Sequence, residues 1–303
     1  DDEVRCINYV FSSPTEGPLV SAQRLSVDAH LIVETGANTV KISQGMQNPH
    51  FLSECERLGL NVFLELPVFQ VPNGILTDAA FIRSCLDQMI SMIDRDGRYS
   101  CVAGWGIGGG IEPPNKNNIQ FYKQLTDLIH QIDHRPVFAV TTRMGMPNFS
   151  PLDFIILDRI ALDDIKFVEK ISDSQAHRVI IGNITHLIYP GNFKGLADPT
   201  SEIYQAHHLR QALTQIENAS WCRGAVVSDL LDWRGSIPTI SGPLKGTSNI
   251  YTSGILTSSR QPRPAHRVLM NHWKLAKSEP LTQGSYTNSD GSILVVIGLI
   301  LIV

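Results

Sequence analysis

The sequence predicts a single α/β domain of the (β/α)8 barrel class, also called a TIM barrel. Short apolar runs recur eight times with longer amphipathic segments between them. The runs are almost continuously apolar, which is typical of parallel strands that are buried on both faces. An open doubly wound sheet would favour a glycine-rich phosphate turn after its first strand, and residues 10–15 contain none. Eight strand–helix units close naturally into a barrel.

The expected elements follow one another in strict alternation. Strands are predicted at residues 5–10, 39–43, 61–66, 102–107, 137–141, 154–157, 179–184 and 224–230. Helices are predicted at residues 21–35, 49–58, 78–94, 118–132, 164–172 and 201–218, with a last helix inside 251–275. Thr77 and Asp78 form a helix start signal, whereas Gly36, Gly59 and Gly97 follow helix ends. Residues 235–250 are interpreted as a long loop on the face where barrel enzymes carry their sites.

Composition excludes several classes of function. The chain has 303 residues, is 43% hydrophobic and carries a net charge of −4, so no basic stripe indicates nucleic-acid binding. The five cysteines include no CxxC pair, and no His, Asp and Glu residues have metal-ligand spacing. We therefore predict no metal, no cofactor and no disulfide framework. Cys6, Cys101 and Cys222 start apolar runs, where buried thiols are expected.

The C-terminal part differs from the rest of the chain. We expect the barrel over residues 1–278, a polar linker over 279–292 and an apolar tail over 293–303. As a helix, the eleven uncharged tail residues would extend about 16 Å, roughly half a bilayer core. The tail is either part of a transmembrane helix or a buried strand, and the polar linker favours the first interpretation. Membrane attachment there would place the barrel outside the cytoplasm.

Four motifs carry a family resemblance. Residues 36–43 read GANTVKIS, and residues 49–67 read PHFLSECERLGLNVFLELP. Residues 95–108 read RDGRYSCVAGWGIG, and residues 254–269 read GILTSSRQPRPAHRVL. In this order, and over about residues 5–275, they resemble the barrel of glycoside hydrolase family 2, the group of β-galactosidases, β-glucuronidases and β-mannosidases. The resemblance implies a β-linked glycan as ligand and two carboxylates, at the ends of strands four and seven, that hydrolyse it with retention.

The two carboxylates of that family are missing from their aligned positions. Gly109 and Gly110 stand where the family has Asn and the acid/base Glu, and Asn183 stands where it has the nucleophile. Glycine cannot deliver a proton, and an amide can hydrogen-bond a sugar but cannot form the usual glycosyl-enzyme. We therefore predict a degenerate, non-hydrolytic domain that binds a carbohydrate or serves as a scaffold for a protein partner.

An active glycosidase with a rearranged carboxylate pair is the alternative. Glu112 and Pro113 resemble an "NEP" ending that is displaced by two residues, and a flexible glycine run before them could bring Glu112 into place. Glu112 would then be the acid, with Glu65 or Asp229 as its partner. Carboxyl groups about 5 to 9.5 Å apart around an open pocket would favour this enzyme.

Further polar and aromatic residues at strand ends are candidates for sugar contacts, although each could instead be structural. Lys41 replaces an arginine of the family, and Trp105 and Trp233 are candidate stacking surfaces. The expected substrate-binding residues are Lys41, Glu65, Trp105, Asp158, Asn183, His186, Asp229, Asp232 and Trp233.

Overall fold

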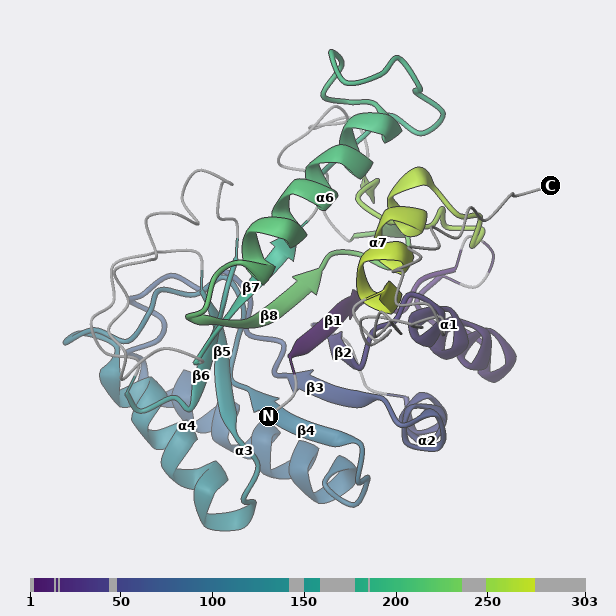
Figure 1. Ribbon diagram of the computed structural model, residues 1–303. Coiled ribbons are helices and arrows are strands. Elements are labelled where there is room, and N and C mark those ends of the chain that lie inside the picture. The colour runs from purple at the N-terminus through teal and green to yellow at the C-terminus, as the bar shows by residue number, and fades with distance from the viewer. Residues whose placement is uncertain are drawn as a thin grey trace, which may run out of the picture.

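Eight parallel strands close into a barrel in the computed structural model of this chain (Figure 1). The structure describes residues 3–13, 15, 17–43, 48–141, 150–158, 178–184, 186–235 and 249–275. The strands keep their chain order around the barrel, and β1 pairs in parallel with both β2 and β8, which closes it. The predicted (β/α)8 barrel is confirmed. The strands are β1 (Val4–Tyr9), β2 (Thr39–Ile42), β3 (Asn61–Glu65), β4 (Val102–Gly106), β5 (Val137–Thr141), β6 (Phe154–Leu157), β7 (Val179–Ile184) and β8 (Cys222–Val227).

Helices surround the barrel in the positions that the sequence predicts (Figure 1). Asp78 caps α3 by accepting a hydrogen bond from the Phe81 N–H at 2.8 Å. Gly59 ends α2 with φ 70°, a left-handed conformation that glycine adopts without strain. The helix predicted at residues 164–172 lies outside the described residues. The helices are α1 (Ala22–Glu34), α2 (Pro49–Leu58), α3 (Ala79–Asp96), α4 (Ile119–Ile132), α6 (Glu202–Glu217) and α7 (Pro264–Leu275).

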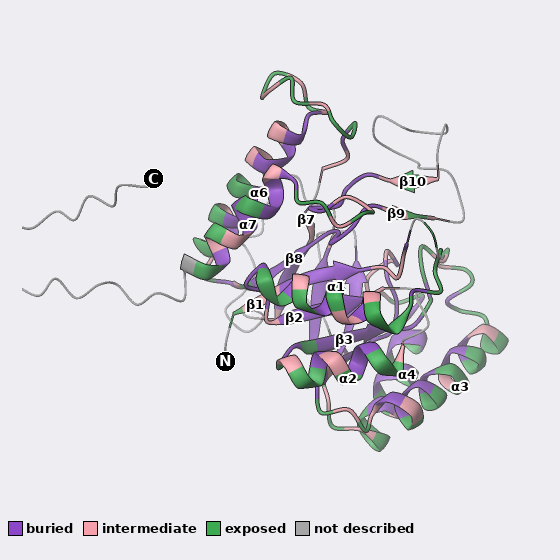
Figure 2. Ribbon diagram, turned by 90° about the vertical axis from the view of Figure 1, so that its right-hand side faces the viewer, coloured by how far each residue is buried: buried purple, intermediate pink, exposed green. Residues whose placement is uncertain are grey.

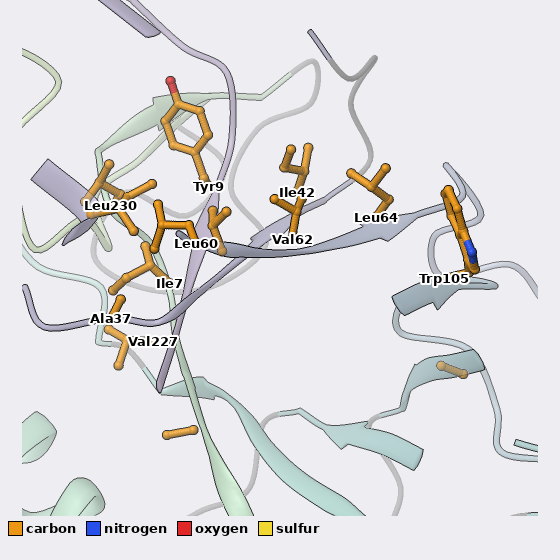
Figure 3. Packing of buried hydrophobic residues seen from close by; sticks show 14 of the residues in the cluster. Ile7, Tyr9, Ala37, Ile42, Leu60, Val62, Leu64, Trp105, Val227 and Leu230 are labelled. Atoms are coloured by element: carbon orange, nitrogen blue, oxygen red, sulfur yellow. The ribbon is translucent and has the colours of Figure 1, made fainter. Parts of the chain in front are cut away.

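The core has two layers, one inside the barrel and one around it. The outer layer lies between the strands and the inner faces of the helices, which are buried in Figure 2. Figure 3 shows part of this outer layer, which includes the side chains of Ile7, Val62 and Leu64. The inner layer fills the barrel with Cys6, Phe63, Phe138, Val140, Phe154, Ile156, Ile180 and Val226. Both layers are continuous, so the barrel has a packed interior below its mouth.

The eighth strand and the loop after it differ in detail from the prediction. β8 begins and ends earlier than expected, because the chain beyond Val227 leaves the barrel and Leu231 pairs with Leu256. The predicted loop at 235–250 is bracketed by β9 (Trp233–Arg234) and β10 (Ile250–Tyr251), which pair with each other in antiparallel fashion. Residues 236–248 lie outside the described residues. The hairpin stands at the mouth of the barrel.

The hypothesis of membrane attachment gains no support from the described part of the chain. None of the helices there combines the length and the apolar character that crossing a bilayer requires. The predicted linker at 279–292 and the tail at 293–303, on which the hypothesis rests, lie outside the described residues.

Candidate functional site

The carboxyl ends of the strands carry a layer of polar side chains that point into the barrel. Successive side chains of a strand point to opposite faces, so a residue two positions beyond an interior residue also points inward. Asn8, Glu65 and Asp158 each lie two positions beyond a residue of the inner apolar layer. Lys41 lies between two residues of the outer layer and therefore also points inward. We call these four residues the floor of the barrel mouth.

Lys41 is the central positive charge of the floor. Its Nζ lies 3.1 Å from Glu65 Oε2 and donates hydrogen bonds to Asn8 Oδ1, at 3.3 Å, and to Ser43 Oγ. Burial alone would lower the pKa of Lys41, but the negative charges of Glu65 and Asp158 outweigh burial and raise the pKa. Lys41 therefore remains protonated and acts as the counter-ion of carboxylates within its own chain.

Asp229 forms a second polar centre immediately beyond β8. Its Oδ1 accepts a hydrogen bond from Asn8 Nδ2 at 2.6 Å. Its Oδ2 accepts from Trp233 Nε1 at 2.8 Å and from Ser253 Oγ at 2.7 Å. Burial raises the pKa of Asp229, although these hydrogen bonds and the charge of Lys41 act in the opposite direction. Both carboxylate oxygens thus have donors from the chain itself.

An aromatic pair lies at the rim of the mouth, beyond Asp229. The ring of Trp233, in β9, stacks on the ring of Tyr251, in β10, with centroids 4.2 Å apart and planes within 3° of parallel. Both residues are half-buried. Sequence reasoning predicted Trp233 as a sugar platform but missed Tyr251, because only the β9–β10 pairing brings the two rings together.

The glycine run after β4 is fixed by hydrogen bonds of its backbone. The Gly109 N–H donates to Val68 O at 2.8 Å, and Gly109 O accepts from the Gln70 N–H at 2.9 Å. Gly108 O accepts from the Val140 N–H at 2.9 Å. These hydrogen bonds connect the run to the segment after β3 and to β5.

Glu112 follows this run and is half-buried. Its backbone carbonyl accepts hydrogen bonds from the Tyr122 hydroxyl and from Asn118 Nδ2, the latter at 3.3 Å. Both donors belong to the start of the α4 region, so the backbone at Glu112 is held between β4 and α4. Any catalytic use of the Glu112 carboxyl group has to begin from this fixed backbone position.

Two glycines leave space that carboxylates of the floor occupy. A Cβ atom at Gly109 would lie 2.8 Å from Glu65 Oε1. A Cβ atom at Gly182, on β7, would collide with Asp158 Oδ1 and lie 2.5 Å from Ile156 Cγ2. Side chains at these positions would therefore displace the neighbouring carboxylates.

Asn183 and His186 lie on and just after β7. Asn183 is half-buried and has φ 51°, a left-handed conformation that asparagine tolerates better than most residues. The ring of His186 packs against α6, with its centroid 4.8 Å from that of Tyr204 and 5.5 Å from that of His208. Burial lowers the pKa of His186, and a hydrogen bond to the Pro199 backbone opposes this effect.

Two candidate residues contact other parts of the protein instead of the mouth. Gly104 and Gly106 take the inward positions of β4, so Trp105 points outward into the outer layer and has no exposed surface (Figure 3). Asp232 is buried and forms a bidentate ion pair with Arg263. The Nη1 and Nη2 atoms of Arg263 lie 2.7 and 2.5 Å from the carboxylate oxygens of Asp232. We leave Trp105 and Asp232 out of the proposed site for these reasons.

The structure adds residues that sequence reasoning did not select. Asn8 could have been found, because it is a polar residue at an inward position of an apolar strand. Ser253 and Tyr251 gave no signal in the sequence, since their contacts with Asp229 and Trp233 depend on the tertiary fold.

The described part of the chain shows no group of three His, Cys, Asp or Glu side chains that could hold a metal ion. The five cysteines are free thiols, and Cys6 and Cys101 are buried as expected. Cys222 is only half-buried, and burial raises its pKa to about 11. The thiols therefore stay protonated and unreactive near neutral pH.

A closed barrel of eight parallel strands with helices around it is the (β/α)8 architecture. Residues 5–277 match the glycosyl hydrolases family 2, TIM barrel domain, and the chain belongs to this family. The family that the four motifs predict is thus confirmed.

Relatives of known sequence include two β-galactosidases. The chain is 27% identical over 132 residues to the enzyme of Thermoanaerobacterium thermosulfurigenes and 30% identical over 140 residues to that of Thermoanaerobacter pseudethanolicus. These alignments cover 43% and 46% of the chain but 18% of either relative. The chain therefore corresponds to only part of these enzymes.

Solved structures with the same fold are longer as well. A family 2 β-galacturonidase from Eisenbergiella tayi, solved with galacturonate, superposes with a TM-score of 0.81 at 18% identity, covering 91% of this chain and 51% of that one. The Faecalibacterium prausnitzii β-glucuronidase gives a TM-score of 0.74 at 20% identity, covering 90% of this chain and 49% of that one. At such low identity these structures establish the fold alone.

Proposed function

We propose that this barrel binds a β-linked glycan at its mouth without hydrolysing it by the double displacement of its family. The observation that carries the proposal is the pair Gly110, just beyond β4, and Asn183, near the end of β7, which occupy the positions that the motif alignment assigns to the two carboxylates. Retaining hydrolysis requires one carboxyl group that protonates the leaving oxygen and a second that attacks, roughly 5 to 5.5 Å apart. Neither glycine nor an amide can take these roles.

The other carboxylates of the mouth support the proposal because each has partners within the chain. Glu65 is 1% exposed and pairs with Lys41, so its carboxylate is neutralised and covered. Asp229 is 6% exposed and accepts hydrogen bonds on both oxygens. A nucleophile needs free access to the anomeric carbon, and neither group offers it.

Several groups of the mouth remain suited to hold a sugar. Trp233 is half-buried, and aromatic rings stack on the C–H face of a pyranose. Asp158, Asn183 and His186 are also half-buried and provide hydrogen-bonding atoms near β6 and β7. A β-linked glycan is the ligand that the family relationship favours, because the relatives include β-galactosidases and a β-galacturonidase.

Hydrolysis is the first test of the proposal. The purified chain is incubated with 4-nitrophenyl β-galactoside, β-glucuronide and β-galacturonide, and release of nitrophenol is recorded. We expect no turnover above the buffer rate. Turnover that Glu112→Gln abolishes, and that Glu34→Gln on the exposed end of α1 leaves intact, would establish the alternative enzyme and sink the proposal.

Binding is the second test. Isothermal titration with cellotetraose, β-1,4-mannotetraose, β-1,4-galactotetraose and chitotetraose covers four common β-linked backbones. We expect at least one of these tetrasaccharides to bind. If none binds and none is hydrolysed, glycan recognition is ruled out, and a scaffold for a protein partner becomes the better hypothesis.

A further inference from the structure

Trp233 differs from the other three tryptophans of the chain in its exposure. Trp105, Trp221 and Trp273 are 0%, 7% and 2% exposed, whereas Trp233 is half-buried. Its accessible surface lies away from Tyr251, because the face that stacks on Tyr251 at 4.2 Å is covered. The indole is thus supported on one face by Tyr251 and keeps part of its surface accessible.

Three contacts fix the orientation of the Trp233 ring. Tyr251 supports it from one face, and Asp229 Oδ2 accepts the indole N–H at 2.8 Å. Gly235 lies at the edge of both rings, since a Cβ atom there would be 2.7 Å from Tyr251 Cε2 and 3.2 Å from Trp233 Cζ3. The main chain at Gly235 is held in turn, because its N–H donates to Asn249 O at 2.8 Å.

The floor offers a sugar much less than this rim does. Three of its four residues, Asn8, Lys41 and Glu65, are only 9%, 7% and 1% exposed, and hydrogen bonds and the Lys41–Glu65 ion pair connect them to one another and to Asp229. Binding there would require breaking the Lys41–Glu65 ion pair and providing a new partner for each of the two charges. Binding on the rim requires no such rearrangement.

We infer that Trp233 and Tyr251 form one preorganised platform for a pyranose ring and that Tyr251 is its positioning residue. This inference rests on the proposed glycan binding and assigns the place where the sugar lies. The sugar stacks its C–H-rich face on the open side of Trp233, and Tyr251 holds the indole in the plane that this contact needs. A ring that is fixed in advance loses little side-chain entropy when the ligand binds, which increases affinity.

Quenching of tryptophan fluorescence by acrylamide tests the platform directly. The three buried tryptophans are shielded from the quencher, so the accessible signal belongs to Trp233. Each of cellotetraose, β-1,4-mannotetraose, β-1,4-galactotetraose and chitotetraose is added in turn. We expect every tetrasaccharide that binds in calorimetry to protect this signal and the Trp233→Phe variant to lack the protectable component.

Substitutions at Tyr251 test its positioning role. Tyr251→Ala should weaken binding about tenfold and remove the protection of Trp233, whereas Tyr251→Phe should retain both, because it keeps the stacked ring. Tyr189→Ala is the matched control, since Tyr189 is a 44% exposed tyrosine on the loop between β7 and α6. It should bind like the parent chain. If Tyr251→Ala does not fold by thermal melting, Tyr251→Leu replaces it as an apolar variant without a planar ring.

The outcomes separate this inference from the proposed function. Binding by the parent chain with no protection of Trp233, or unchanged binding by Tyr251→Ala, would overturn the platform and leave glycan binding intact. Loss of binding in Tyr189→Ala would indicate that the sugar binds at the loop between β7 and α6. That result would overturn the platform as well. A parent chain that binds none of the four tetrasaccharides would overturn both.

Discussion

Lys41 sets the electrostatics of the mouth at the scale of a single residue. The buried ammonium group pairs with Glu65, and the charges of Glu65 and Asp158 raise its pKa against the effect of burial. Removing one partner of a buried ion pair leaves the other charge without compensation in a medium of low polarity. The floor therefore depends on this cation for its stability.

The substitution Lys41→Met should lower the free energy of unfolding by about 3 to 5 kcal/mol, because it leaves the Glu65 carboxylate buried and unpaired. Urea denaturation followed by circular dichroism measures the loss. Adding Glu65→Gln to the same chain should restore part of the stability. Arg57→Met breaks the exposed Arg57–Glu54 pair and is the control, with a much smaller effect. Equal losses in the two single variants would contradict this account of the floor.

Gly182 is a residue whose lack of a side chain is structurally required. We expect Gly182→Ala to destabilise the barrel by about 1 to 3 kcal/mol, since the new methyl group meets Asp158 Oδ1 and Ile156 Cγ2. Thermal denaturation provides the measurement. Gly74→Ala is the matched control, because nothing lies within 4 Å of a Cβ atom there. Combining Gly182→Ala with Asp158→Ala should recover part of the stability, since only the clash with Ile156 Cγ2 then remains. No recovery would show that the carboxylate is not an obstacle.

At the scale of elements, the loop between β7 and α6 is ordered by its own polar side chains. Asp198 Oδ1 accepts hydrogen bonds from the Thr200 N–H at 2.9 Å and from Thr200 Oγ1 at 2.7 Å. Its Oδ2 accepts from Asn192 Nδ2 at 3.0 Å. These hydrogen bonds lower the pKa of Asp198 to about 2.

The lowered pKa makes this loop sensitive to acid. Since the pKa of Asp198 lies near 2 in the folded chain and near 4 when unfolded, its stabilisation is complete above about pH 4 and is lost as the pH falls through 2. NMR titration of the Asp198 carboxyl carbon should give a midpoint near 2, and amide signals of residues 191–200 should shift with it. In Asp198→Asn the acid-induced shifts should disappear. A midpoint near 4 would contradict the hydrogen-bonded geometry.

The elements of this fold follow from local sequence signals, whereas the site depends on contacts between distant elements. The Asp78 cap and the Gly59 stop are encoded within a few residues, so the ends of α3 and α2 could be predicted. The prediction that Trp105 lines the mouth ignored which face of β4 its two glycines occupy. The Trp233–Tyr251 stack is formed by the pairing of two short strands, and neither residue predicts it alone.

At the scale of the whole molecule, Arg263 connects the rim to the surrounding helices. It lies immediately before α7, contacts both carboxylate oxygens of Asp232 beyond β8, and places its Nε 3.5 Å from Glu202 Oε1 at the start of α6. These three segments meet only in the folded chain. The ion cluster therefore closes the last part of the barrel against its helices.

Removing this cation should destabilise the whole domain. We expect Arg263→Met to lower the free energy of unfolding by about 3 to 5 kcal/mol, because Asp232 is left buried without its partner. Arg267→Met, on the exposed face of α7, is the control and should change little. Guanidinium denaturation monitored by fluorescence compares the two. A loss confined to signals of α7 would mean that the contact is local and does not hold the domain together.

The crowding around Gly182 imposes an order on any redesign of this part of β7. A side chain fits at that point of β7 only after Asp158 and Ile156 have been made smaller or moved away, because a Cβ atom there would meet both. A protein engineer who introduces a carboxylate at Asn183 and a side chain at Gly182 must therefore change Asp158 and Ile156 first. Taken in the reverse sequence, the same changes pass through a variant that the clash destabilises.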